Sequence, residues 1–307
     1  MTLKSTIKIL WVVVGFFSFL GFILFIFTIF NGAYFNTSFQ IDTELASKFG
    51  NFFGGFIGTL FAITSTLLIL VTLLQQNIDN KKSQTGGNFF KMLDYHTENV
   101  KQLCISHIDP DKKEDKIEGR RAFVIFKLQL IELCKVVNKI KKELQLGLSN
   151  EEIIDIVYIA FYYGIDKDWE KFAENKLSRY QKGKEIAKLL LDAKNSDSKN
   201  IGRTNQTSLS SYFRNLYNAV KLIDNDKNLT LDEKKQYIKI LRAQLSNPEL
   251  YVFFFNIVSR FGKKWKENGY IDTYELIKNI PLDYLGNYNP KDFFLITYEE
   301  DEINKFC

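Results

Sequence analysis

The stretch 9–30, ILWVVVGFFSFLGFILFIFTIF, contains 22 residues and no charged side chain. As an α-helix it is about 33 Å long, at about 1.5 Å per residue, which is enough to cross a hydrocarbon layer of about 30 Å. A cleaved signal peptide is the alternative interpretation. Its apolar region usually has only about 7–15 residues, and no small-residue cleavage site follows promptly here. We therefore predict a transmembrane helix at about 9–30.

A second uncharged stretch, 49–78, reads FGNFFGGFIGTLFAITSTLLILVTLLQQNI and is most apolar at 52–74. It predicts a second transmembrane helix at about 52–74. Of the 41 basic and 36 acidic residues, only five basic and three acidic ones lie in 1–84. This composition excludes a one-domain soluble protein and predicts a membrane anchor at 1–84 followed by a domain at 85–307. The remaining net charge of the domain is too small to indicate nucleic acid as a partner.

The basic residues that flank the two stretches predict their orientation. Lys4 and Lys8 precede the first stretch, and Lys81 and Lys82 follow the second. The loop between the stretches has no Lys or Arg before Lys48. Because cytoplasmic flanks carry the excess of Lys and Arg, we expect a multi-pass membrane protein with both termini in the cytoplasm.

The second stretch carries small residues at every fourth position. The members of this small-residue stripe, with one neighbouring glycine, are Gly50, Gly54, Gly58, Ala62, Thr66 and the adjacent Gly55. Small residues let helix backbones approach closely in a membrane, where no hydrophobic effect drives helix association. The stripe fits packing against the first span of the same chain, or packing between chains in a homo-oligomer. Neither span holds the charge that ion-coupled transport usually needs. Two short spans also cannot build the inverted repeats of a transporter, so a pore could form only by oligomerisation.

The rest of the chain predicts an all-α fold, because apolar residues recur there at helical spacing. Ser149 with Glu152, and Thr230 with Glu233, are spaced as capping boxes that open helices. The polar segment 195–208 is a possible internal linker. The expected helices lie at about 88–105 after a break at Gly86–Gly87, 117–146, 150–163, 168–180, 184–194, 213–223, 231–246 and 248–261, with Gly262 as a stop signal. A strand is expected only at about 293–298.

The domain shows no recognisable catalytic, metal or cofactor motif. The chain has two histidines, His96 and His107, and contains no phosphate-binding glycine loop and no zinc-type spacing of Cys or His. The run 224–232 resembles a calcium loop in its alternating Asp, Asn and Thr. It has Leu229 where the tight turn needs Gly and Lys235 where a bidentate Glu is needed, so it predicts an interhelical loop. We predict no catalytic residue, no metal and no cofactor.

Three polar and aromatic segments are more constrained than packing requires: 96–100 with the GRRAF of 119–123, YFRNLY at 212–217, and LRAQLSNPEL at 241–250 with FFN at 254–256. With the two spans and the GNFFGG of 50–55, they resemble the putative phage abortive infection proteins, the AbiC-like family. The resemblance covers nearly the whole chain except about 145–200. It implies a bacterial antiphage effector in the inner (cytoplasmic) membrane that kills or arrests an infected cell, and it supplies no catalytic residues.

These segments contain the candidate functional residues, which are His96, Gly119, Arg120, Arg121, Tyr212, Arg214, Tyr217, Arg242, Gln244, Ser246, Glu249 and Asn256. A buried Arg needs a partner, so one interpretation is a clamp between Arg242 and Glu249 across the break at Asn247–Pro248. The other is a cleft in which Arg120, Arg214 or Arg242 holds a phosphate or a phage-derived ligand.

The favoured function is a toxin effector whose helical domain responds to an unknown phage or defence-system trigger. Its transmembrane helices then oligomerise and disrupt the lipid bilayer. One alternative is a membrane-tethered nuclease or nucleotide-processing enzyme, with a metal site built from Asp94, Glu98 and Asp155. Another is a non-toxic sensor or adaptor that recruits a second protein.

Overall fold

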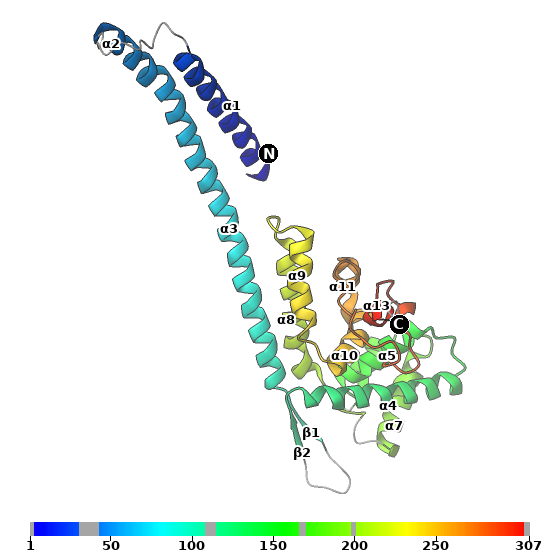
Figure 1. Cartoon of the computed structure of the whole chain (residues 1–307). Coiled ribbons are helices and arrows are strands. Elements are labelled where there is room, and N and C mark those ends of the chain that lie inside the picture. The colour runs from blue at the N-terminus through cyan, green and yellow to red at the C-terminus, as the bar shows by residue number, and fades with distance from the viewer. Residues whose placement is uncertain (1–2, 31–42, 108–114, 166–169, 198–200, 304–307) are drawn as a thin grey trace. The chain divides into compact units, whose positions relative to one another are not determined.

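The apolar stretches form long helices in the computed structural model of the chain, which describes residues 3–30, 43–107, 115–165, 170–197 and 201–303. The chain divides into two compact units, Met1–Gln84 and Thr85–Cys307 (Figure 1). Nearly every element of the described residues is a helix, so the all-α prediction is confirmed.

The first unit consists of α1 (Leu3–Phe30), α2 (Thr43–Phe52), one π-helical turn η1 (Phe53–Ile57) and the beginning of α3 (Gly58–Lys101). The two segments Leu3–Thr28 and Ala46–Lys101 are long and apolar enough to cross a membrane, judged by length and composition. They contain the span predicted at about 52–74 and all but the last two residues of the one predicted at about 9–30.

A narrow seam of buried residues joins α1 to α3, and its members recur at alternating intervals of three and four. On α1 a regularly spaced set of buried and half-buried positions is Ile7, Leu10, Val14, Phe17, Gly21, Leu24 and Thr28; the matching set on η1 and α3 is Ile57, Leu60, Thr64, Leu67, Val71, Leu74 and Ile78. This is the seven-residue repeat of coiled-coil packing. The Phe61 ring packs against α1 at Gly21, where its nearest atom would lie 3.5 Å from an added Cβ, an ordinary van der Waals distance.

The second unit begins within α3, and two expectations for this region are wrong. The helix runs through Gly86–Gly87 without a break and ends at Lys101, whereas it was expected to reach Ile105. After it, β1 (Cys104–His107) and β2 (Asp115–Glu118) pair as an antiparallel hairpin with Cys104 opposite Glu118. The expected strand at 293–298 is also wrong, because this segment has no strand partner among the described residues and lies between a short 3₁₀ turn and α13 (Glu299–Ile303).

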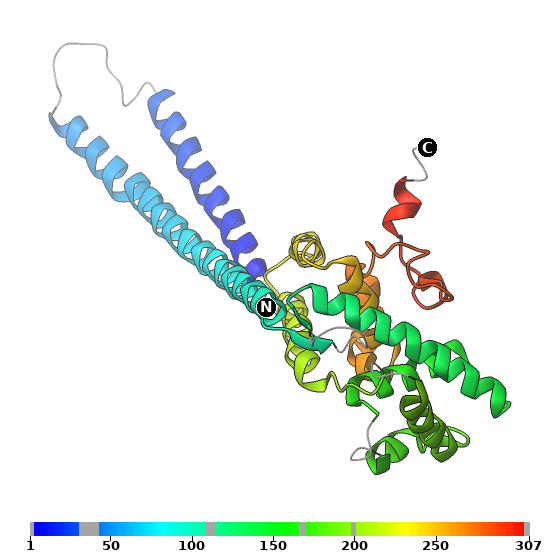
Figure 2. The same ribbon diagram turned by 90° about the horizontal axis from the view of Figure 1, so that it is seen from below.

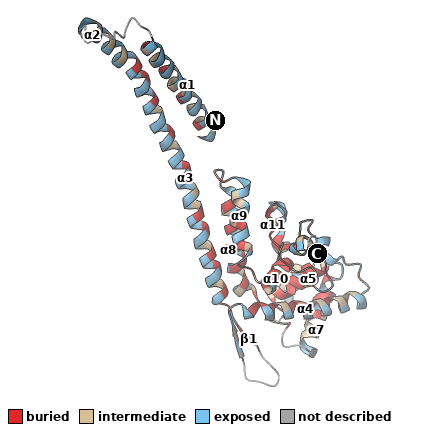
Figure 3. Ribbon diagram, viewed as in Figure 1, coloured by how far each residue is buried: buried red, intermediate tan, exposed pale blue. Residues whose placement is uncertain are grey.

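The remaining elements are α4 (Arg121–Glu143), α5 (Asn150–Tyr163), α6 (Glu170–Leu177), α7 (Gly183–Asp197), α8 (Gln206–Asn225), α9 (Leu231–Arg242), α10 (Asn247–Val258), η3 (Arg260–Gly262), α11 (Lys263–Glu267), α12 (Tyr270–Tyr274), η4 (Pro290–Asp292) and α13 (Glu299–Ile303). The centre of the unit is formed by α5 and α10, which are buried all round (Figure 3). A helix that is apolar on every face belongs in a core. The amphipathic α4 packs against both (Figure 2).

Local sequence signals define several helix starts. In the capping box at α5, Ser149 N donates to Glu152 Oε2 at 2.9 Å and Glu152 N donates to Ser149 Oγ at 3.2 Å. Thr230 and Glu233 make the same pair of bonds at α9, at 2.6 and 3.3 Å. Both predicted capping boxes are confirmed.

Two polar segments have structural roles that differ from the expected ones. In the expected linker 195–208, whose residues 198–200 lie outside the described residues, Ile201 and Asn205 are buried. Asn205 Nδ2 donates to Gln129 Oε1 at 3.0 Å, so this segment is packed into the core. The helix expected to reach Phe261 ends at Val258, and Gly262 serves a close approach, because a Cβ there would lie 2.3 Å from Ile257 Cα.

Candidate functional site

A buried carboxylate, that of Glu249, lies in the first turn of α10. Its side chain is fully buried, and Oε2 accepts hydrogen bonds from Ser246 N at 2.9 Å and Ser246 Oγ at 2.5 Å. Oε1 accepts a long bond of 3.4 Å from Tyr212 Oη on α8. The Ser-x-x-Glu spacing thus makes a third helix start, and the same carboxylate is available to other elements.

Arg120, next to the start of α4, is the cationic partner of this carboxylate. Its Nε lies 3.3 Å from Glu249 Oε2, and its Nη2 donates to the Gln244 carbonyl at 2.7 Å. The turn into α4 requires a positive φ of +64° at residue 119, which Gly119 adopts readily because it has no Cβ. Arg120 therefore ties the corner between α9 and α10 to the start of α4.

The clamp expected between Arg242 and Glu249 is wrong. Arg242 Nη1 donates to the Glu275 carbonyl at 2.8 Å and lies 3.7 Å from Glu275 Oε2. Ion pairs depend on proximity in space and not in sequence. Arg120 and Glu249 are 129 positions apart in the sequence, and the fold brings them into contact.

His96 completes the buried group from α3. Its side chain is 3% exposed, its Nε2 lies 3.8 Å from Glu249 Oε1, and its ring centroid lies 4.8 Å from that of Tyr212. Neither ring nitrogen has a hydrogen-bond partner among the described residues. Burial, followed by the positive charge of Arg120, lowers the pKa of His96 to about 4, so the ring is neutral at pH 7.

The same part of α3 is attached to α8 and α9 by further contacts. The Phe89 and Tyr237 ring centroids lie 5.2 Å apart, and Asn215 Nδ2 donates to the Met92 carbonyl at 2.8 Å. Together with His96, these contacts dock the segment of α3 after Gln84 against the helices that carry the YFRNLY and LRAQLSNPEL segments.

A second group of candidate residues lines a cleft of about 470 Å³. Arg214 and Tyr217 reach it from α8 and Asn256 from α10, where Asn256 Nδ2 donates to Tyr158 Oη at 2.8 Å. The helix α8 thus presents Tyr212 to the buried carboxylate and Arg214 and Tyr217 to the cleft. Arg121, an exposed residue at the start of α4, is not among the described residues that line this cleft.

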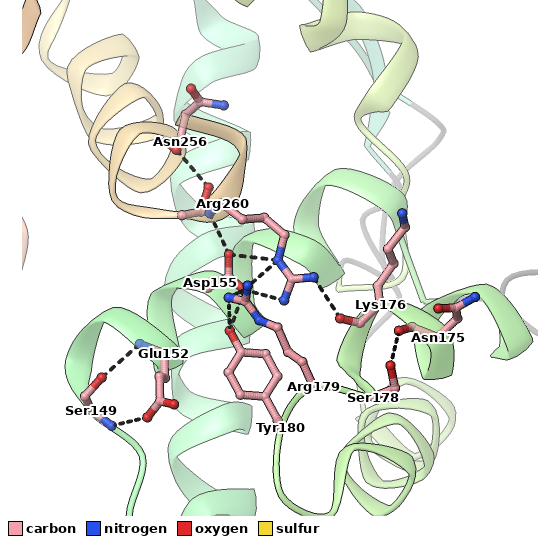
Figure 4. Close-up of polar contacts among 11 residues, drawn as sticks. Ser149, Glu152, Asp155, Asn175, Lys176, Ser178, Arg179, Tyr180, Asn256 and Arg260 are labelled. Carbon is pink, nitrogen blue, oxygen red and sulfur yellow. Dashed lines mark hydrogen bonds and ion pairs between the residues drawn. The ribbon is translucent and has the colours of Figure 1, made fainter. Parts of the chain in front are cut away.

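The Asp155 network in Figure 4 was not predicted as such. Asp155 is 4% exposed, and its Oδ2 accepts bonds from Arg260 Nη2 at 2.7 Å, Arg179 Nη2 at 2.8 Å and Tyr180 Oη at 2.5 Å. Its Oδ1 accepts from Arg260 N at 2.7 Å. Burial alone would raise the pKa of Asp155, but the hydrogen bonds from Arg260 and Tyr180 outweigh it, and the pKa is lowered.

The nuclease alternative required the Asp155 carboxylate as a metal ligand together with Asp94 and Glu98, but this carboxylate is already bound within the network. Two guanidinium groups and a phenol take the oxygens of Asp155, while the other two carboxylates lie on α3. The structure forms no group of three or more His, Cys, Asp or Glu side chains able to hold a metal ion within its described ranges. The expected grouping is therefore wrong. A lone Asp inside the apolar run IIDIVYIAF was the sequence signal for a buried ion pair.

The small-residue stripe lies outside the seam with α1. Its members Gly50, Gly54, Gly58, Ala62 and Thr66 are all exposed, as is Gly55. A Cβ added at Gly54 or Gly55 would meet no atom of the described residues within 4 Å. Within this chain, the first span does not cover the stripe.

These features describe an all-α protein with two helices long and apolar enough to span a membrane, joined to a helical domain that encloses a buried ion-pair group beside a basic cleft. Residues 204–285 match the family model described as putative phage abortive infection protein, and this match supports an AbiC-like family assignment. No curated protein and no solved structure matches the chain. The family domain indicates a role in antiphage defence.

The matched segment contains most of the candidate residues. Those inside it are Tyr212, Arg214, Tyr217, Arg242, Gln244, Ser246, Glu249 and Asn256. His96 and the 119–121 segment lie outside it, but Arg120 and His96 contact Glu249 in the fold.

Proposed function

We propose that the protein is a membrane-anchored abortive infection effector. Its helical domain responds to infection, and its transmembrane helices associate between chains through the small-residue stripe and disrupt the inner membrane. The observation that carries this proposal is the exposure of the stripe on a face that α1 leaves open.

The stripe has the extent and chemistry of a helix interface in lipid. From Gly50 to Thr66 it covers about 24 Å at about 1.5 Å per residue, most of a hydrocarbon layer of about 30 Å. Lipid tails are as apolar as Leu, so close backbone packing of small residues is what favours association there. The turn at Phe53–Ile57 is a π-helix. This form is rare in proteins as a whole, and where it occurs it often lies at a functional site.

The cytoplasmic part of α3 offers a route from the helical domain to the span. Residues 58–101 form one helix, and its part after Gln84 is held by Phe89, Met92 and His96. A trigger can change how the domain holds α3 only if it binds one arrangement of the domain better than the other. A change in how α8–α10 hold α3 is the event that we propose the trigger favours.

Cross-linking in membranes tests the association surface. We would replace the three native cysteines by Ser in the full chain and add Ala62→Cys on the stripe or Val12→Cys on the exposed face of α1 as the matched control. After oxidation, we expect a disulfide-linked dimer for Ala62→Cys alone. Equal cross-linking of both variants, or none in either under infection, contradicts the proposal.

A toxicity assay distinguishes the effector from the sensor or adaptor alternative. The effector requires that the full chain arrests growth in infected cells, whereas an adaptor causes no arrest when it is produced without its partner. A Gly15→Leu variant controls for a bulky residue in a span, because a Cβ at Gly15 meets no described atom within 4 Å and lies on the other helix.

A further inference from the structure

The cleft beside α8 has the size of a small-ligand site. Its volume of about 470 Å³ falls in the range of about 300–1,000 Å³ in which proteins hold small molecules. Arg214 and Lys221 enter it from one face of α8, two turns apart, and Lys264 enters it from α11. A cleft of this volume encloses a small molecule better than it encloses a polymer.

The charged side chains among the described residues that line this cleft are all cationic. No Asp or Glu belongs to the described residues that line it. Lys221 and Lys264 form no ion pair in the part of the chain that the structure describes, and Arg214 Nε donates only a 3.3 Å bond to the Ser210 carbonyl of its own helix. Like charges gathered in a concave surface focus a field that attracts anions. A guanidinium beside two ammonium groups suits a phosphate group.

Aromatic rings form the other wall. Tyr217 packs edge-on against Trp265, with ring centroids 5.1 Å apart, and Phe261 packs against Tyr162 at 4.8 Å. Asn256 adds an amide that is 4% exposed and held in place by Tyr158. Trp265 itself is only 3% exposed, so the half-buried rings of Tyr217, Tyr162 and Phe261 are the ones that offer stacking surface to a planar ligand. The fixed amide offers directional hydrogen bonds.

A larger basic cavity of about 800 Å³ beside α4 lacks this arrangement. There, Lys127 Nζ lies 3.3 Å from the centroid of the Tyr284 ring, Lys135 pairs with Glu132 at 2.7 Å, and Asp283 lies in the wall. Its cations are partly compensated, and no Arg reaches it among the described lining residues. The smaller cleft is therefore the better anion site.

We infer that the cleft binds a nucleotide. Arg214, Lys221 and Lys264 hold its phosphates, and its base lies against the half-buried ring of Tyr217, which Trp265 holds in place. This inference deepens the proposed function, because it names the chemical class of the trigger, but binding itself does not depend on association of the spans.

The test is calorimetric titration of the purified full chain in detergent micelles. The probes are an equimolar mixture of ATP, GTP, CTP and UTP, each of these alone, inorganic tripolyphosphate, adenosine and a single-stranded 12-mer DNA. We expect at least one nucleotide to bind, tripolyphosphate to compete with it, and adenosine to bind at least tenfold more weakly. The Arg214→Ala/Lys264→Ala variant should bind at least tenfold more weakly than the unchanged chain, while Lys139→Ala/Lys142→Ala in the larger cavity should bind equally well.

Several results overturn the inference. These are no binding of any nucleotide at millimolar concentration, equal binding by the Arg214→Ala/Lys264→Ala variant, and tripolyphosphate binding as tightly as the best nucleotide. Tighter binding of the 12-mer through the same residues would replace it by nucleic-acid recognition. Equal melting temperatures of the variants exclude misfolding as the cause. A Gly54→Leu/Gly58→Leu variant that is harmless yet still binds nucleotide separates failure of this inference from failure of the proposed function.

Discussion

The Asp155 network gives the sharpest stability prediction. Asp155→Ala removes the acceptor of two guanidinium groups and leaves Arg260, whose side chain is only 25% exposed, without its anion. Breaking a buried ion pair by removing one partner costs about 3–5 kcal/mol. Since Arg179 is 53% exposed and solvent screens its pair, Arg179→Ala should cost less than about 1 kcal/mol.

The expected order of destabilisation is therefore Asp155→Ala first, at about 3–4 kcal/mol, then Arg260→Ala, then Arg179→Ala. For a domain of this size, 1 kcal/mol lowers the melting temperature by about 2–4 °C, so Asp155→Ala should lower it by about 10 °C. Heat unfolding of the full chain in micelles, followed by circular dichroism, measures the shifts. Glu132→Ala, which breaks the exposed pair with Lys135, is the control and should shift the midpoint by less than about 2 °C.

The charge of Asp155 adds a pH dependence whose sign follows from its lowered pKa. A carboxyl with a lowered folded-state pKa contributes stability above its unfolded value of about 3.9, and this stability is lost as the pH falls through the folded-state pKa. The difference between the unchanged chain and Asp155→Asn should therefore shrink below about pH 4. The reasoning is refuted if Arg179→Ala costs as much as Arg260→Ala, or if Asp155→Ala lowers the midpoint no more than Glu132→Ala.

Three further changes test other parts of the account. Because the folded-state pKa of His96 is about 4 against about 6.5 when unfolded, stability should fall by up to about 3 kcal/mol as the pH drops from 6.5 to 4, and His96→Phe should remove this loss in melts across that range. Gly262→Ala places a Cβ 2.3 Å from Ile257 Cα and should cost about 3 kcal/mol or more, whereas Gly147→Ala, with no described atom within 4 Å, should be tolerated in the same melts. Thr230→Ala removes a capping box and should cost about 1 kcal/mol by thermal unfolding; no change would remove the cap from the account.

The sequence predicted those parts of the fold that depend on local signals. The buried face of α4, with Phe123, Phe126, Leu130 and Leu133, follows from helical spacing, and both predicted capping boxes lie at their helix starts. The β1–β2 hairpin was missed because four-residue strands carry no usable periodicity. The alternating segment 293–298 buries Phe294 and Tyr298 without a strand partner, so alternation there reflects packing alone.

The candidate site was predictable in its residues but not in its pairs. Glu249 was assigned to Arg242 because they are close in sequence, while Arg120 reaches it through the fold. The Ser-x-x-Glu spacing at Ser246 was visible in the sequence and would have identified the third capping box. The sequence could not predict which candidates face the cleft. Tyr212 and Arg214 lie on opposite sides of one helix, and the side that faces the cleft is known only from the packing of that helix.

The membrane potential of living cells tests the central claim most directly. It should be recorded with and without phage in cells that make equal amounts of the full chain, the Gly54→Leu/Gly58→Leu variant or the Gly15→Leu control. The account predicts that infection collapses the potential in cells with the unchanged chain and with Gly15→Leu, and that the stripe variant preserves it. Growth arrest with an intact potential, or an equal collapse in the stripe variant, would contradict membrane disruption through the small-residue stripe.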